Sequence, residues 1–178
     1  TASGDYVLAV EGFEPCIWMD CPADAVPEGE GHVADGFVDD YNGGCNSPEY
    51  GSPFQAINWI NVEPGNPYDG YAWMCGIAGQ FTAADGTSSR DTDWFTVTAL
   101  TTGTMEFTVA AEFETLIFKL DPLNCDAVGV ELSATATCEP ATLSFPVTEG
   151  EEIWLWVGSS TFGAPTTEWN YYMYLSNN

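Results

Sequence analysis

Short segments rich in Val, Ile, Thr, Tyr, Phe and Trp dominate the sequence, and Gly, Pro, Asn and Asp separate them. No long 3.6-residue periodicity, the pattern of an amphipathic helix, interrupts them. Within residues 104–109, apolar Met105, Phe107 and Val109 alternate with polar residues, so this strand buries one face and exposes the other. Strands are expected at 6–11, 57–62, 71–78, 94–100, 104–110, 115–120, 128–134, 142–147, 153–157 and 171–175. Their close spacing predicts an all-β fold, a jelly-roll-like β-sandwich with an N-terminal extension strand.

The charge balance restricts the partners of the chain. Its 178 residues include 27 Asp and Glu but only 2 Lys and Arg, which gives a formal net charge of −25, and 45% of the residues are apolar, too many for a disordered chain. We expect one sandwich domain at 28–178, preceded by an N-terminal strand and disulfide-bearing linker at 1–27. So acidic a surface is a poor partner for nucleic acid or an anionic membrane, and cations are its natural partners.

The six cysteines favour disulfide bonds over a zinc site, because no Cys-x-x-Cys pair or Cys/His cluster occurs. The sequence leaves their connectivity open, but pairing of neighbours closes local loops and predicts Cys16 with Cys21, Cys45 with Cys75 and Cys125 with Cys138. Disulfides persist outside the cytosol. No apolar run is long enough for membrane insertion, and Thr1 is interpreted as the N-terminus left after removal of a signal peptide. We therefore expect a secreted protein, extracellular or at the cell surface.

An Asp-x-Asp-Trp-Phe motif at residues 91–95 precedes Gly103 and alternating strands, and Thr148-Glu149-Gly150 precedes the apolar segment 153–157. With these features, residues 28–176 resemble bacterial prepeptidase C-terminal (PPC-type) domains. The resemblance implies a secreted jelly-roll sandwich of the kind that is appended to exported proteases. In collagen-binding members of that family, acidic residues in the segment that enters the sandwich join the Asp-x-Asp carboxylates around calcium. This implies calcium ligands at Glu28, Glu30, Asp91 and Asp93.

The match to the calcium motif of that family is incomplete. Gly31 and His32 replace the Asn-Asp that follows Glu-x-Glu in the family, so Asp39 and Asp40 are expected to supply further carboxylates. The residues themselves also favour calcium, since this cation takes six to eight oxygen ligands and relieves the repulsion between clustered carboxylates. The alternative is that these acidic side chains are merely solvated loop charge.

No assembled catalytic group is evident in the sequence. His32 is the single histidine, no Gly-x-Ser-x-Gly motif occurs, and disulfides account for the cysteines. A pair of carboxylates can hydrolyse glycosides, but among 27 acidic residues such pairs arise often by chance. We therefore expect a protein that is not an enzyme.

Alternation within segments 153–157 and 171–175 places aromatic side chains on the face opposite the core. If the two strands pair, these side chains form one surface patch of Trp154, Trp156, Tyr172 and Tyr174. An exposed patch of this kind indicates a ligand or protein interface, and glycans are the expected ligand. The alternative is a satellite core that the irregular segment 12–56 covers.

Residues 6–10 form an apolar run, and Gly12 and three prolines separate it from the sandwich. The run consists of Tyr6, Val7, Leu8, Ala9 and Val10 and requires burial on both faces. It pairs either with its own sheet or with a neighbouring subunit by donor-strand insertion, a head-to-tail contact that generates a fibre. The leading hypothesis is a non-enzymatic structural protein that assembles with itself into an extracellular filament. The alternative is a secreted accessory module that binds carbohydrate, another polymer or calcium.

Overall fold

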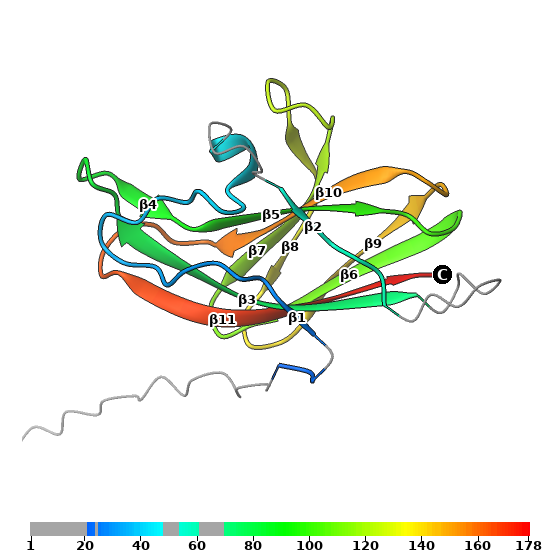
Figure 1. Ribbon diagram of the computed structural model, residues 1–178, viewed down its shortest axis with the longest axis horizontal. Helices are drawn as coiled ribbons and strands as arrows, with labels where there is room; N and C mark the ends of the chain where they lie inside the picture. Colours follow the sequence, from blue (N-terminus) through cyan, green and yellow to red (C-terminus); the bar gives the residue numbers. More distant parts are fainter. Residues whose placement is uncertain (1–20, 24, 48–53, 61–69) are drawn as a thin grey trace, which may run out of the picture.

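A computed structural model describes residues 21–23, 25–47, 54–60 and 70–178. In these residues the chain forms two β-sheets, which lie one above the other in Figure 1. Sheet A contains, in spatial order, β1 (Val26–Pro27), β3 (Tyr71–Thr82), β11 (Thr167–Asn177), β6 (Gly103–Ala111) and β9 (Ala141–Val147), with β4 (Ser88–Arg90) also paired to β3. Sheet B contains β2 (Gln55–Ala56), β5 (Thr92–Thr98), β10 (Glu152–Ser159), β7 (Thr115–Asp121) and β8 (Gly129–Ala136). The predicted all-β sandwich is confirmed.

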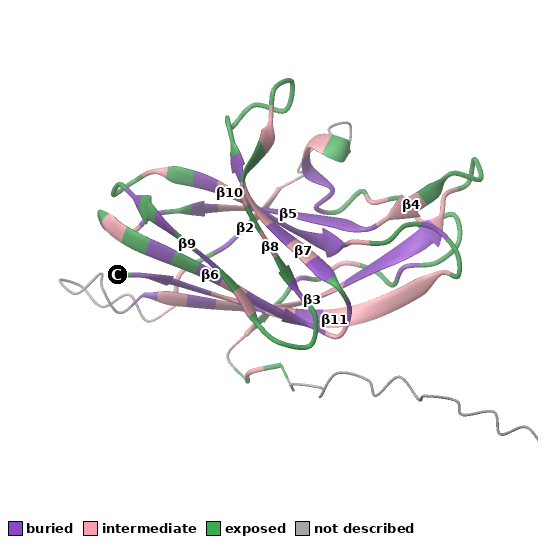
Figure 2. Cartoon of the chain, turned by 180° about the vertical axis from the view of Figure 1, so that it is seen from behind, coloured by how far each residue is buried: buried purple, intermediate pink, exposed green. Residues whose placement is uncertain are grey.

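Alternating residues of both sheets form the core between them. In β6, Met105, Phe107 and Val109 are fully buried, as the alternation predicts. Leu155 and Val157 of β10 lie in the same core cluster and come from the opposite sheet. Figure 2 shows the resulting purple bands of buried residues along the strands of both layers. Burial of one apolar face of each sheet against the other is what holds the two layers together.

The predicted strands from 71–78 onward lie within or largely overlap β3 and β5 to β11. Three short strands were not predicted, namely β1, β2 and β4, because two or three residues carry too little periodicity to be recognised. In the described part of the strand expected at 57–62, residues 57–59 form no strand and Ile60 forms an isolated bridge with Tyr71, and the short strand β2 precedes them at 55–56. The expected strand at 6–11 lies outside the described residues.

The predicted pairing of segment 153–157 with the C-terminal strand is wrong. β10 pairs with β5 and β7 in sheet B, whereas β11 pairs with β3 and β6 in sheet A. Both strands are apolar on the core side, but they contribute to the core from opposite sheets. The four aromatic residues of the expected patch therefore lie on opposite outer faces of the molecule.

The predicted disulfide pairing is also wrong. Cys21 is bonded to Cys75 and Cys45 to Cys125, across separations of 54 and 80 residues. Cys138 is disulfide-bonded as well, and Cys16 lies outside the described residues. Neighbour pairing fails because the sheets bring distant cysteines together. Bonds of this kind form in an oxidising compartment and indicate an exported protein. No helix in the described part of the chain is long and apolar enough to cross a membrane.

The stretch from Glu28 to Ser47, here called the entering segment, has little regular structure but is tied to both sheets. Its Gly36 N–H donates a hydrogen bond to the Thr82 carbonyl of β3, and its Val33 N–H donates to the Glu168 carboxylate of β11. On sheet B, the Trp94 N–H donates to the Asn42 carbonyl at 2.9 Å. These contacts lay an irregular segment over the end of the sandwich where its acidic residues meet β5.

Candidate metal centre

Five carboxylates from the entering segment and from the start of β5 converge at one place. Glu28 follows β1 directly, Asp91 stands between β4 and β5, and Asp93 is the second residue of β5. Glu28, Asp91 and Asp93 are each at most 2% exposed. Glu30 and Asp39 reach the same place from the entering segment and are partly buried. Carboxylates are seldom buried without a partner, so this cluster requires an explanation.

The five carboxylates form two groups that share Glu30. One group is Glu28, Glu30 and Asp93, and the other is Glu30, Asp39 and Asp91. Within each group, one carboxylate oxygen per residue lies within 4.8 Å of those of the other two. This spacing allows one cation to contact three carboxylates at once.

Hydrogen bonds hold several of these carboxylates in fixed orientations. The Asn42 side-chain amide donates to Glu28 Oε1 at 2.6 Å and to Asp93 Oδ1 at 3.0 Å. The other Glu28 oxygen accepts from the Ile77 N–H at 3.0 Å. The buried Tyr171 hydroxyl donates to Glu28 Oε1 at 3.2 Å. The neutral donors thus orient Glu28 and Asp93 without supplying positive charge.

The remaining oxygens of the cluster have no hydrogen-bond donor. Among the described residues, seven buried side-chain oxygens lack a partner here: both of Glu30, both of Asp91, and one each of Asp39, Asn42 and Asp93. Buried acceptors are nearly always satisfied in folded proteins, since an unmade hydrogen bond costs the desolvation of the group. Seven unpaired oxygens at one place point to a ligand that accepts electron pairs from oxygen.

No side-chain cation neutralises the cluster. The described part of the chain contains two ion pairs, His32 with Glu168 and Lys119 with Glu131, and neither includes a cluster residue. Arg90 adjoins Asp91 in sequence, but its guanidinium donates to the Ser159 carbonyl. The negative charge of the buried cluster is therefore uncompensated by the protein itself.

Without a bound cation, the cluster holds protons. Burial raises the pKa of Glu30 to about 9, and repulsion from neighbouring carboxylates adds to this effect. Burial also raises the pKa of Asp39 to about 6, although a hydrogen bond from Thr92 opposes the shift. The pKa values of Asp91 and Asp93 are raised well above the ordinary value, first by burial and then by nearby carboxylates. A cation that binds here competes with these protons.

The donor set fits calcium. Among the described residues, all ligand atoms available at the cluster are oxygens and neither histidine nor cysteine takes part, and Ca²⁺ prefers six to eight oxygens from carboxylates and carbonyl groups. Glu28, Glu30, Asp39, Asp91 and Asp93 would hold the ion, with Asn42 Oδ1 beside them. The geometry thus brings together five of the six carboxylates singled out in the sequence. The sixth, Asp40, is exposed and belongs to neither group.

Two supporting residues were not predicted from the sequence. Asn42 and Tyr171 act only through contacts with residues far along the chain, and no local motif marks them. Gly76 is a third: a Cβ atom there would lie 2.3 Å from a Glu28 oxygen and 2.5 Å from the Tyr171 hydroxyl. A glycine at this position of β3 lets Glu28 and Tyr171 approach each other.

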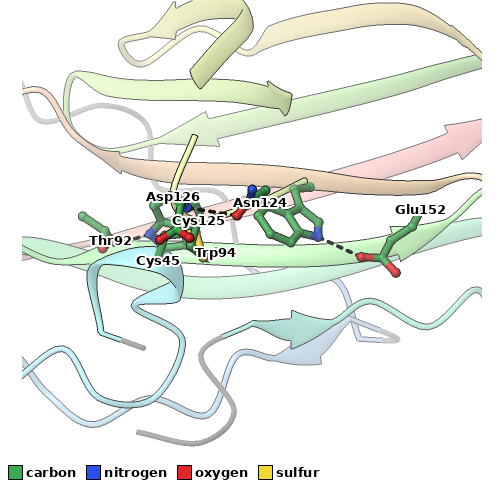
Figure 3. The surroundings of a disulfide bond; sticks show 8 residues. Cys45, Thr92, Trp94, Asn124, Cys125, Asp126 and Glu152 are labelled. Carbon is green, nitrogen blue, oxygen red and sulfur yellow. Dashed lines mark hydrogen bonds between the residues drawn. A yellow bond between two sulfur atoms is a disulfide. The ribbon is translucent and has the colours of Figure 1, made fainter. Parts of the chain in front are cut away.

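The aromatic residues of the expected patch have separate environments. On the outer face of sheet B, Trp156 is buried in a cluster with Trp94 and Leu120, and Cys45, Phe54 and Trp154 pack against it. Figure 3 shows the Cys45–Cys125 disulfide beside Trp94, whose indole N–H donates to Thr92. On this face the aromatic residues thus form a satellite core, which Cys45 and Phe54 of the irregular segment help to cover. On sheet A, Tyr172 and Tyr174 pack beside Trp73.

His32, the single histidine, is 90% exposed at its side chain and pairs with Glu168. It lies in the entering segment, where its Nδ1 is 2.9 Å from a Glu168 oxygen. No nucleophile is paired with it among the described residues. Its contact instead helps attach the entering segment to β11.

Comparison with protein-family models and with curated proteins finds no match, so the PPC-type resemblance stays a prediction. Several solved structures are similar at low identity, among them two lysozyme inhibitors and a mitogen. PliG of Aeromonas hydrophila, a periplasmic inhibitor of g-type lysozyme, is 10% identical, with 69% of this chain and 94% of that chain covered and a TM-score of 0.49. PliG of Salmonella Typhimurium is 12% identical, with coverages of 68% and 97% and a TM-score of 0.37. The Yersinia pseudotuberculosis-derived mitogen is 11% identical, with coverages of 61% and 86% and a TM-score of 0.36. Likenesses this distant carry no argument about function.

Proposed function

We propose that this protein is an extracellular, non-enzymatic β-sandwich module that binds calcium at the cluster of Glu28, Glu30, Asp39, Asp91 and Asp93. The observation that carries the proposal is the set of seven buried, unpaired oxygens in a cluster with no cationic side chain. A doubly charged ion with oxygen ligands removes both the unmade hydrogen bonds and the repulsion at once.

The ion would act as a clamp between the entering segment and sheet B. Glu30 and Asp39 belong to the entering segment, whereas Asp91 and Asp93 adjoin or belong to β5. The same segment includes Gly44 and Cys45, which pack on the buried cluster of Trp94, Leu120 and Trp156, here called the Trp94 cluster. Loss of the ion would therefore loosen the cover of the outer face of sheet B as well as the site itself.

The test is a thermal melt of the disulfide-intact protein after chelation and after addition of excess calcium. A ligand present at 100 times its dissociation constant stabilises the folded state by about 2.7 kcal/mol, so calcium is expected to raise the melting temperature by several degrees. Magnesium serves as a control, because its preference for a small octahedral shell fits a carboxylate-rich cluster less well. Identical melts with chelator and with calcium would contradict the proposal.

Filament formation is the second candidate, and one observation supports it. Cys21, where the described chain begins, is covalently tied to Cys75 in the middle of β3, so the described chain enters the sandwich at a fixed point of sheet A. Among the described strands, β9 and β8 each pair on one side only. A donor strand from a neighbouring subunit adds to such an edge through backbone hydrogen bonds.

Deletion of residues 1–11 tests this second candidate. The proposal expects that negative-stain micrographs show filaments for the full chain and monomers for the deleted chain. The calcium-dependent melt of the deleted chain is the control, since it should be unchanged if the sandwich is intact. Filaments that persist after the deletion, or a full chain that stays monomeric at high concentration, would contradict donor-strand assembly.

A further inference from the structure

A concave site lies beside β3 and β11 of sheet A. The pocket has a volume of about 320 Å³ and is lined by residues of β3, β10, β11 and the turn after β6. Its lining residues are Gln80, Glu112, Phe113, Glu114, Ser159, Ser160, Thr161 and Trp169. We call it the Trp169 pocket. None of these residues belongs to the proposed calcium site.

An aromatic ring is held rigidly in the pocket. Trp169 is half-buried, and the buried Phe113 stacks against it with ring centroids 5.4 Å apart and planes at 22°. A fixed indole at a pocket wall offers a flat apolar surface, and its π face attracts a cation. Phe113 therefore orients the platform on which a ring-shaped ligand can lie.

The polar groups of the pocket are two carboxylates and three hydroxyl groups. Glu112 and Glu114 contribute the carboxylates, and one oxygen of Glu112 already accepts from the Asn170 backbone and side-chain N–H groups. Ser159, Ser160 and Thr161 contribute the hydroxyl groups, of which those of Ser159 and Thr161 are hydrogen-bonded to each other. Gln80 is only 8% exposed, and its side-chain oxygen has no hydrogen-bond partner, while its amide nitrogen donates to the Pro165 carbonyl at 3.0 Å. The Gln80 oxygen has almost no accessible surface, so the acceptors that a ligand can reach are the carboxylates and the hydroxyl groups. These groups suit a ligand that is rich in donors.

The negative charge of the pocket and of the whole chain favours positively charged ligands among those rich in donors. The pocket carries two carboxylates, and the only guanidinium near it, that of Arg90, already donates to the Ser159 carbonyl and lies over the Trp156 and Phe162 rings. A chain with a net charge of −25 attracts cations from a distance. An ammonium group is therefore attracted both by the carboxylates of the pocket and by the net negative charge of the chain.

We propose that the Trp169 pocket binds a protonated amino sugar, with the sugar ring stacked on Trp169 and its ammonium group directed to Glu112 and Glu114. The flat indole favours a sugar ring over a lysine side chain, because an aliphatic stem has no flat face to stack. The hydroxyl groups of the pocket suit the hydroxyls of a sugar. The volume lies at the lower end of the roughly 300–1,000 Å³ typical of ligand pockets, which fits one or two rings.

The experiment uses the full, calcium-loaded chain and three probes in about 0.15 M NaCl, at a pH at which the amine is protonated. The probes are a short β-1,4-linked glucosamine oligomer, the same oligomer fully N-acetylated, and lysine blocked at its α-amino and carboxyl groups. Binding is followed by tryptophan fluorescence and by chemical-shift changes. The glucosamine oligomer is expected to bind at least about tenfold more tightly than each of the other two, because only it combines a ring with a charge-assisted hydrogen bond.

Two variants locate the binding. Glu114→Gln removes one charge from an exposed side chain of the pocket and is expected to weaken glucosamine binding about tenfold. Glu106→Gln makes the same change at an exposed position of β6 outside the pocket and should leave the affinity unchanged. Both variants should keep the calcium-dependent melt of the wild type, which separates a failure here from a failure of the calcium proposal.

Each opposite result overturns the proposal. If the acetylated oligomer binds as tightly as the glucosamine oligomer, the ammonium group does not contribute to binding. If blocked lysine binds as tightly, the natural ligand is a protein instead. If Glu106→Gln weakens binding as much as Glu114→Gln does, the interaction is general electrostatics rather than a site. Absence of binding by the wild type to the glucosamine oligomer excludes the site.

Discussion

Asn42 and Asp93 lie 51 positions apart in the sequence, and the Asn42 amide donates a hydrogen bond to Asp93 Oδ1 at 3.0 Å. One step along the backbone, the Trp94 N–H donates to the Asn42 carbonyl. These two bonds join the irregular entering segment to β5 at the point where the carboxylates converge. The metal centre and the attachment of the entering segment are therefore one structural unit, and perturbation of either should be felt by the other.

Substitution of Asp93 by Asn should change the stability of the ion-free protein and the affinity for calcium in opposite directions. In the ion-free folded protein Asp93 is protonated, and the uptake of this proton costs free energy at neutral pH. Asn has the same shape and is neutral without proton uptake, so the ion-free protein should become more stable, on the order of 1 kcal/mol, while calcium affinity falls at least about tenfold. Denaturant unfolding with and without calcium measures both effects. The matched control is Asp40→Asn, an exposed neighbour outside both carboxylate groups, which should change each quantity much less. Loss of stability in the ion-free Asp93→Asn protein would contradict the inference that burial and the neighbouring carboxylates destabilise ionised Asp93.

The stability of the ion-free protein should fall as the pH rises. Glu30 has a pKa of about 9 in the folded state against 4.5 ordinarily, and Asp39 about 6 against 3.8. Between these limits the folded state binds more protons than the unfolded state, so its advantage is complete below about pH 4 and is lost as the pH rises toward 9. Calcium keeps the carboxylates ionised in the folded state and should remove this slope. Melts with chelator and with calcium across this range provide the measurement, and parallel curves would count against the prediction.

Removal of the Cys45–Cys125 disulfide should destabilise the protein by roughly 2–5 kcal/mol, because the bond closes a loop across 80 residues in the unfolded chain. The double variant Cys45→Ser with Cys125→Ser avoids a free thiol. Because Cys45 also packs on the Trp94 cluster, tryptophan fluorescence should shift toward that of solvent-exposed indole. An unchanged spectrum would mean that the cover of sheet B does not depend on this bond.

Substitution of Gly44 by Ala should destabilise the entering segment by roughly 1–3 kcal/mol. A Cβ atom at Gly44 would lie 2.0 Å from the Trp94 ring, and the residue has a positive φ of 55°. Gly31→Ala in the same segment is the control, since no atom lies within 4 Å of its Cβ position. Chemical denaturation compares the two variants, and equal losses would refute a specific clash with Trp94.

Several features were predictable because they are local. Alternation fixed which side chains of β6 point into the core, and the acidic residues of 28–40 and 91–93 identified the carboxylates of the cluster. The expected patch of Trp154, Trp156, Tyr172 and Tyr174 was not correct, because alternation defines the two faces of a strand but not the sheet to which the strand belongs.

Residue type and a period of two are sufficient to predict the all-β class, the buried positions along each long strand and the carboxylates of the acidic cluster. The folded structure is needed to define which segments contact each other. It placed β10 and β11 in different sheets, joined Cys21 to Cys75 and Cys45 to Cys125, and brought Asn42 to Asp93. Such contacts join residues far apart in the chain, and only the closed sandwich, through the burial of both apolar faces at once, selects among the many pairings that the local pattern allows.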